Sequence, residues 1–304
     1  TTVFDTTDRI QHMFYRYLDE NHPANEGVDH EEFAETIANV YKHMDDLLGR
    51  VWDQVTREDT LFLVISDHGF TNFRRGVNLN TWLRESGYLV LNEGASTSGD
   101  WFEDVDWTQT RAFSLGLTGV FINRKGREKE GIVKEGEEYR SLVDEIKAGL
   151  EHLADPQTNE RCIRRVRVSA RFFDGPYRFD APDLLIGYEG GYRNSWECAT
   201  GAVTETVFSD NTRAWSGDHC VDPDIVPGVM FCNRPIGIEE PQLIDIPASV
   251  LTQFGIQPPR YMRGKDLFAN DNVIGMLNPS TLEQSGRPPL ARAHQKGQEG
   301  SNER

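Results

Sequence analysis

Residues 61–69 have the sequence Leu-Phe-Leu-Val-Ile-Ser-Asp-His-Gly, which is the clearest indication of the fold class in this chain. Its uninterrupted apolar run has the length of a strand, and the lack of alternating polar positions is typical of a strand covered on both faces in a mainly parallel sheet. In such sheets, ligands bind at the carboxyl ends of the strands. We therefore expect chemistry at Asp67 and His68, which follow the strand directly.

Helical and strand patterns alternate on both sides of this stretch. Helices are predicted at 8–18, 29–51, 80–85, 137–153 and 247–254, and strands at 88–91, 111–123, 161–171, 183–188 and 229–232. The segment 161–171 alternates Val with Arg, which indicates an exposed edge strand, and the Gly-rich segment 190–201 is predicted to be a loop. Alternating strands and helices favour an α/β layered domain with a mostly parallel sheet.

Composition limits the classes of function. The chain has 304 residues, a hydrophobic content of 38% and a net charge of −17, so it can bury one sizeable core but repels the backbone of a nucleic acid polymer. A phosphorylated substrate would need a local positive centre such as metal ions. The four cysteines contain no C-x-x-C pair, which favours a reducing, cytoplasmic compartment, and no apolar run approaches the roughly 20 residues that cross a bilayer. We expect no membrane partner.

Carboxylate and imidazole side chains are paired at two places. Asp67 and His68 are adjacent, and Gly69 allows the backbone to turn so that both side chains face one point, although an Asp-His-Gly turn is often purely structural. Asp8 and His12 are four residues apart on a predicted helix, which places both on one face within reach of one ion. The alternative there is a helix-capping Asp with a half-buried His.

Two further residues are candidates at this stage. Asp5 is a rival ligand to Asp8, because it too can lie at a strand end. His219 lies in the loop sequence Ser-Gly-Asp-His, and loops of this kind present side chains, although a surface histidine is the alternative. The remaining histidines, His22, His30, His43, His152 and His294, have no partner at ligand spacing and are interpreted as solvated or structural.

The three motifs occur in an ordered series: D-x-x-x-H at Asp8 and His12, S-D-H-G at 66–69, and G-D-H at 217–219. This series resembles type I phosphodiesterases and nucleotide pyrophosphatases of the alkaline phosphatase superfamily. The stretches TDRIQHMFYRYLD, APDLLIGYEGGYRNSW and SGDHCVDPDIVPGVMFCNRPI are similar to a bacterial branch of predicted phosphohydrolases or phosphomutases. The resemblance covers the chain from Thr7 to about Leu267.

The resemblance implies a three-layer αβα fold with a mostly parallel central sheet, and two divalent metal ions. By this resemblance Asp8, His12 and His219 hold one ion, and Asp67 with His68 helps to hold the second. Such ligands suit zinc, and also manganese or iron. The implied activity is hydrolysis of phosphate diesters or pyrophosphates in small, nucleotide-type substrates. Phosphomonoester hydrolysis, a phosphomutase reaction, and a truncated inactive metal-binding module are the alternatives.

In the family, a Thr or Ser nucleophile attacks phosphorus and forms a covalent phospho-enzyme that water then hydrolyses. The resemblance places this nucleophile, another Asp ligand and the first strand of the sheet well ahead of the D-x-x-x-H element. Thr1 and Thr2 are not assigned as the nucleophile, so we expect an amino-terminal part to be missing. Arg193 is a candidate for binding a substrate phosphate or carboxylate, with a surface salt bridge as the alternative.

The expected domain organisation is one catalytic domain at 1–282 that contains an inserted or cap region at about 92–180. Beyond it, residues 283–304 are rich in Gly, Gln, Arg and Glu, which predicts a disordered tail. The sequence leaves the oligomeric state open.

Overall fold

The structure is a computed structural model that describes residues 1–55, 57 and 59–269. The chain divides into two compact units. The first comprises Thr1–Thr60 and Val64–Met230, and the second comprises Leu61–Leu63 and the chain from Phe231 onwards. The tail predicted at 283–304 lies outside the described residues.

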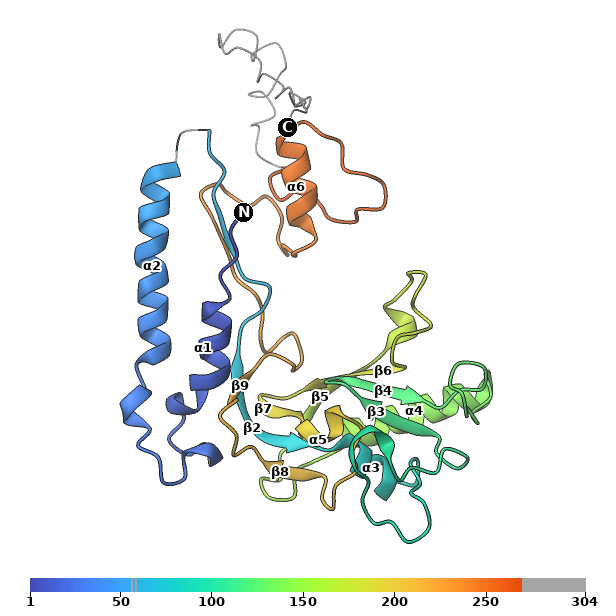
Figure 1. The fold of residues 1–304 in the computed structure, drawn as a ribbon. Helices are drawn as coiled ribbons and strands as arrows, with labels where there is room; N and C mark the ends of the chain where they lie inside the picture. The colour runs from blue at the N-terminus through green and yellow to red at the C-terminus, as the bar shows by residue number, and fades with distance from the viewer. Residues whose placement is uncertain (56, 58, 270–304) are drawn as a thin grey trace, which may run out of the picture. The chain divides into compact units, whose positions relative to one another are not determined.

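Helices and strands are mixed along the chain (Figure 1). The α-helices are α1 (Thr6–Phe14), α2 (Thr36–Val55), α3 (Leu79–Glu85), α4 (Glu137–Glu151), α5 (Trp196–Ala199) and α6 (Asp245–Gln253). The strands are β1 (Leu63–Ile65), β2 (Thr71–Val77), β3 (Ala112–Leu115), β4 (Gly119–Ile122), β5 (Ile163–Val168), β6 (Leu184–Tyr188), β7 (Gly191–Asn194), β8 (Phe208–Asp210), β9 (Gly217–Asp218) and β10 (Met230–Cys232). Among the described helices, none has the length and apolar character that spanning a bilayer requires.

A sheet around β2 organises the first unit. β2 pairs in parallel with β7 and antiparallel with β8 and β9. Its sequence, TNFRRGV, has little apolar character, and ion pairs support it instead. The guanidinium of Arg74 lies 2.8 Å from the carboxylate of Asp19, and that of Arg75 lies 2.7 Å from the buried carboxylate of Asp155. This strand was not predicted from the sequence.

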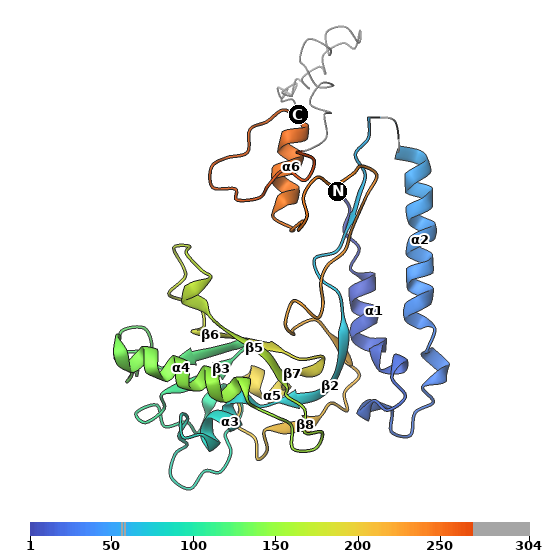
Figure 2. The ribbon, with the colours of Figure 1, turned by 180° about the vertical axis from the view of Figure 1, so that it is seen from behind.

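The second sheet of the first unit has the order β3-β4-β6-β5, and its pairings are all antiparallel. Figure 2 shows α4 lying along this sheet, and Ile146 and Leu150 of α4 belong to the same buried core as Val120 and Leu184 of the strands. A connection of three residues joins β3 to β4, and so short a link can join only antiparallel neighbours. The fold is therefore of the mixed α/β type. Among the described strand pairs whose direction is established, β2 with β7 is parallel.

Several sequence predictions are confirmed by these elements. α3, α4, α6, β6 and β10 lie within a few residues of their predicted bounds, and β5 is an edge strand, as its alternating pattern indicated. Other predictions are wrong. The segment 111–123, predicted as one strand, contains the antiparallel pair β3 and β4. The predicted mostly parallel sheet is not seen, because the established pairings among the described strands are antiparallel except for β2 with β7. The segment 190–201 is not simply a loop, because it contains β7 and α5, and residues 88–91 contribute only a bridge between Leu91 and Val105.

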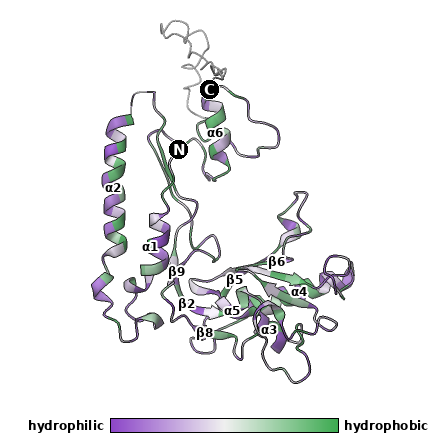
Figure 3. Cartoon of the chain, in the orientation of Figure 1, coloured by the Kyte–Doolittle hydropathy of each residue, from purple (hydrophilic) through white to green (hydrophobic). Residues whose placement is uncertain are grey.

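Helix α2 is long and amphipathic, but it begins at Thr36 rather than near Asp29. It lies beside α1 in both ribbon views (Figures 1 and 2), and Figure 3 shows hydrophobic and hydrophilic residues interleaved along it. Of its apolar residues Ile37 is buried, whereas Tyr41 and Val51 are exposed. The expected packing of its whole apolar face against a core is therefore not seen within the described residues.

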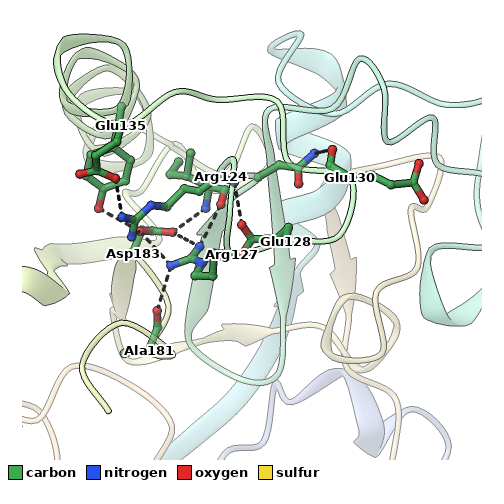
Figure 4. A network of polar contacts seen from close by, with 10 residues as sticks. Arg124, Arg127, Glu128, Glu130, Glu135, Ala181 and Asp183 are labelled. Carbon is green, nitrogen blue, oxygen red and sulfur yellow. Dashed lines mark hydrogen bonds and ion pairs between the residues drawn. The ribbon is translucent and has the colours of Figure 1, made fainter. Parts of the chain in front are cut away.

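A buried carboxylate, that of Asp183, ties β4, β6 and α4 together (Figure 4). It accepts hydrogen bonds from the backbone N–H of Ile122 at 2.7 Å, the hydroxyl of Tyr139 at 2.8 Å and the guanidinium of Arg127 at 2.6 Å. The guanidinium of Arg124 lies 3.5 Å away and also covers the ring of Tyr139. The network satisfies a charge that would otherwise be costly to bury.

We expect the folded chain to lose stability as pH falls below about 6.5, in part because of His22. Its ring is buried, with Nε2 2.9 Å from the carbonyl oxygen of Phe73 and Nδ1 accepting from the N–H of Ala24. Burial lowers the pKa of His22 in the folded chain below its ordinary value. As pH falls, the imidazole is therefore protonated in the unfolded chain before it is protonated in the folded chain, which favours unfolding. Urea unfolding of the protein and of His22→Gln between pH 5 and 8 tests this. A pH dependence that is identical in both would contradict it.

Candidate metal centre

Helix α1 places Asp8 and His12 on one face, as their spacing predicted. The Nε2 of His12 lies 3.5 Å from Oδ2 of Asp8, and its Nδ1 lies 2.8 Å from the carbonyl oxygen of Gly217 in β9. His12 is buried, whereas Asp8 is partly exposed. The pair therefore sits where α1 meets β9, a contact between residues 205 positions apart.

Asp67 and His68 follow β1 at a turn, also as predicted. The Nε2 of His68 lies 3.6 Å from Oδ2 of Asp67, and its Nδ1 lies 3.0 Å from the carbonyl oxygen of Gly69. A Cβ atom at position 69 would lie 3.0 Å from the carbonyl oxygen of Pro227. The glycine therefore allows close approach of the 226–227 segment, which accepts the N–H of Gly69 at 2.9 Å.

His219 joins these two pairs. Its Nε2 lies 3.6 Å from Oδ1 of Asp8, and its ring stacks on that of His68 with centroids 3.7 Å apart. The ring of His12 is 5.1 Å away. Ligand atoms of Asp8, His68 and His219 all lie within 4.8 Å of one another. Three segments that are remote in sequence thus meet at one place.

The donor set fits a divalent cation. Nδ1 of His12 and of His68 each faces a backbone carbonyl oxygen, which favours the tautomer with a free lone pair on Nε2. A contact of this kind from the non-ligating nitrogen to a carbonyl oxygen is typical of metal-ligating histidines. In both residues Nε2 lies 3.5–3.6 Å from a carboxylate oxygen, so imidazole and carboxylate could share one ion. Burial and the neighbouring ring of His68 lower the pKa of His219, which favours the neutral, ligating imidazole.

The assignment of ligands to two separate ions stays a prediction. The tightest group, Asp8 with His68 and His219, takes members from both predicted sets, while His12 and Asp67 lie at its margins. Asp5, the rival to Asp8, instead forms an exposed ion pair with Arg9 at 2.7 Å. A second group with ligand atoms close together, Asp218, His219 and Cys220, shares His219 with the first, but burial raises the pKa of the Cys220 thiol to about 12.

Arg193 is in β7 and pairs with the residue that precedes His219. Only 2% of it is exposed, and its Nε lies 3.1 Å from Oδ2 of Asp218, the residue before His219. Burial alone would raise the pKa of Asp218, but the guanidinium and the hydrogen bonds to the carboxylate outweigh it and lower that pKa. Substrate binding by Arg193 stays a prediction, and the alternative of a surface salt bridge is wrong because the pair is buried.

Trp215 is a residue of this site that sequence reasoning missed. Its ring stacks on His12 with centroids 3.8 Å apart, and its Nε1 donates to Oδ2 of Asp218 at 2.9 Å. The signal available in the sequence was a tryptophan three residues before Asp218 in a Gly-containing loop. A tryptophan in such a loop does not by itself predict a function.

Gly217→Ala is expected to weaken both the fold and the site. A Cβ atom at position 217 would lie 2.4 Å from the backbone oxygen of Gln11 and 2.7 Å from Cβ of Tyr15, so β9 would have to move away from α1. Overpacking of this kind costs about 1–3 kcal/mol, and here it also separates His219 from Asp8. Thermal unfolding and Zn²⁺ titration test both effects. Gly175→Ala, with open space around its Cβ, is the control.

Comparison with known proteins gives one family. The family model described as type I phosphodiesterase / nucleotide pyrophosphatase matches residues 1–210 of this chain. No curated protein matches it. The matched range includes Asp8, His12, Asp67 and His68, whereas His219 follows it.

Proposed function

The chain belongs to the type I phosphodiesterase / nucleotide pyrophosphatase family, and we propose that it hydrolyses phosphate diesters or pyrophosphates at a divalent-metal site. The proposed ligands are Asp8, His12, Asp67, His68 and His219. The observation that carries the proposal is the convergence of Asp8, His68 and His219, whose ligand atoms lie within 4.8 Å of one another although they come from three distant segments.

Electrostatics support a metal at this position. The family is generally metal-dependent, and the net charge of −17 opposes binding of an anionic phosphate unless a cation reverses the local field. Imidazole and carboxylate ligands suit zinc, with manganese or iron also compatible. Two such ions would neutralise the non-bridging oxygens of the substrate and stabilise the entering and leaving oxygens.

The chain's own residues supply binding and orientation. The carbonyl oxygens of Gly217 and Gly69 hold the rings of His12 and His68, so that each Nε2 faces the proposed site. Asp8 bridges the two histidines His12 and His219. We assign the nucleophile to none of these residues; from the family resemblance we propose a Thr or Ser hydroxyl and a phospho-enzyme intermediate.

The proposal extends to architecture. We infer an alkaline phosphatase-like αβα domain across about 1–282, with an inserted or cap region at about 92–180. The antiparallel sheet from β3 to β6 supports this inference, because most of it is built from that range and is separate from the β2 sheet that carries β9 and its site loop. The substrate is proposed to be small and of the nucleotide type.

A substrate panel tests the activity. We expect the full-length protein, stripped of metal, to hydrolyse bis(p-nitrophenyl) phosphate after addition of Zn²⁺ or Mn²⁺, faster than p-nitrophenyl phosphate, and His68→Ala to abolish this hydrolysis. His152→Ala is the control, since His152 is an exposed residue directly after α4 whose ring Nδ1 lies 2.7 Å from the carbonyl oxygen of Ala148. Full activity in His68→Ala would exclude the site, and faster cleavage of the monoester would favour phosphomonoesterase chemistry.

A further inference from the structure

We propose that Arg193 is a positioning residue for His219, acting through the carboxylate of Asp218. The inference rests on the proposed metal site, but it concerns a buried guanidinium that is not itself one of the proposed ligands. Arg193 is in β7, and Asp218 is in β9, directly before His219.

Burial of the guanidinium is the first observation. Its central carbon lies 4.1 Å from the ring centroid of Trp196 and 4.8 Å from that of Phe73, so aromatic faces cover it. Its Nε and Nη1 make no hydrogen bond of good geometry, although Nε lies 3.1 Å from Oδ2 of Asp218. A buried cation is costly unless an anion lies close by. Asp218 is that anion, and Arg193 therefore constrains its position.

The second observation is what Asp218 does with its oxygens. Oδ1 accepts the backbone N–H of His219 at 2.8 Å and that of Cys220 at 2.9 Å, while Oδ2 accepts Nε1 of Trp215. Both oxygens are thus engaged, and they fix the backbone at the ligand itself. This engagement argues against Asp218 as a metal ligand and for a supporting role.

The third observation is that one strand sets the register of both partners. Thr71 of β2 lies opposite Asp218, and Gly76 of the same strand lies opposite Arg193. A Cβ atom at Gly76 would lie 3.0 Å from Cβ of Ser195, so the strands approach closely here. The Arg193–Asp218 pair is therefore held from both sides of β2.

Trp215 extends the same support to His12. It donates to Asp218 and stacks on the ring of His12, so one carboxylate is connected to two of the proposed ligands. Residues that orient metal ligands in this way typically change metal affinity by about 10–100-fold when they are replaced. Arg193 is expected to act in this range although it contacts no proposed ligand side chain in the contacts described.

Zn²⁺ binding to the full protein, measured by calorimetry, tests the inference. We expect Arg193→Met to weaken Zn²⁺ binding by about 10–100-fold, Arg193→Lys to restore part of the loss, and Trp215→Phe, which keeps the stacked ring but removes the donor, to weaken binding less. The matched control is Arg127→Met, which breaks another Arg–Asp pair with a buried carboxylate, that of Asp183 (Figure 4). It is expected to lower the melting temperature while changing the Zn²⁺ dissociation constant by no more than about twofold.

The outcomes separate the inference from the proposed function. If the unmodified protein binds no Zn²⁺, the proposed metal site and this inference both fail. If it binds Zn²⁺ and folded Arg193→Met binds as tightly, or if Arg127→Met loses as much affinity, the inference alone is overturned. Should Arg193→Met fail to fold, Trp215→Phe decides, because unchanged Zn²⁺ affinity in that variant overturns the connection through Asp218.

Discussion

Replacing His219 with alanine is expected to lower the affinity for Zn²⁺ by more than about 100-fold and to abolish metal-dependent hydrolysis. The imidazole of His219 lies between the other candidates, stacked on His68 and 3.6 Å from Asp8. Its removal therefore eliminates a ligand atom and also the packing that holds the His68 ring. Few other single substitutions in the described residues would affect both proposed ligand sets.

Metal content after dialysis and calorimetric titration with Zn²⁺ measure this effect. His43→Ala is the matched control, because His43 is exposed on α2 and its Nδ1 bonds the carbonyl oxygen of Asn39 one turn earlier. We expect the control to match the unmodified protein. Unchanged zinc content in His219→Ala would count decisively against the proposed site.

Asp183→Ala is expected to have the largest effect on stability, a loss of about 3–5 kcal/mol in the free energy of unfolding. The substitution leaves the guanidinium of Arg127 without its closest buried anion, and it removes the acceptor of the Ile122 N–H and of the Tyr139 hydroxyl. A guanidinium left with only the carboxylate of Glu128, and two orphaned donors, would then lie against the antiparallel sheet.

Urea unfolding followed by circular dichroism measures the loss. The control is Asp224→Ala, which breaks an ion pair between Asp224 and Arg165 in which both side chains are largely exposed. Exposed pairs contribute about 0–1 kcal/mol, so the control is expected to unfold close to the unmodified protein. Equal losses in the two variants would show that burial does not determine the strength of the Asp183 network.

Sequence patterns predicted the elements whose stability is local. α4 and β6 carry clear periodicity or continuous apolar runs, and the four-residue spacing of Asp8 and His12 placed them on one helical face. β2 escaped prediction because its support comes from arginines, and their partners Asp19 and Asp155 are far away in sequence. No local window contains both members of such a pair.

The candidate metal ligands could be predicted from the sequence, but the residues that position them could not. Asp8, Asp67 and His219 were assigned to one site by resemblance to a family. No local sequence pattern relates segments that are so far apart. Arg193 was predicted as a possible substrate contact because it is a lone cationic side chain in a Gly-rich segment. Its burial depends on β7, which was hidden in a Gly-rich segment where Gly191 adopts a φ of 87°. Only tertiary packing shows that this arginine faces Asp218.

The hydrogen bond between His12 and Gly217 has a consequence for biosynthesis. It closes a loop of 205 residues, so a ribosome must release nearly the whole first unit before the two ends can meet. Uptake of an ion at this junction would then have to wait for synthesis of the segment that contains His219, and the bound ion would hold α1 and β9 together. At a hundredfold excess over its dissociation constant, such an ion adds about 2.7 kcal/mol to the stability of the closed chain.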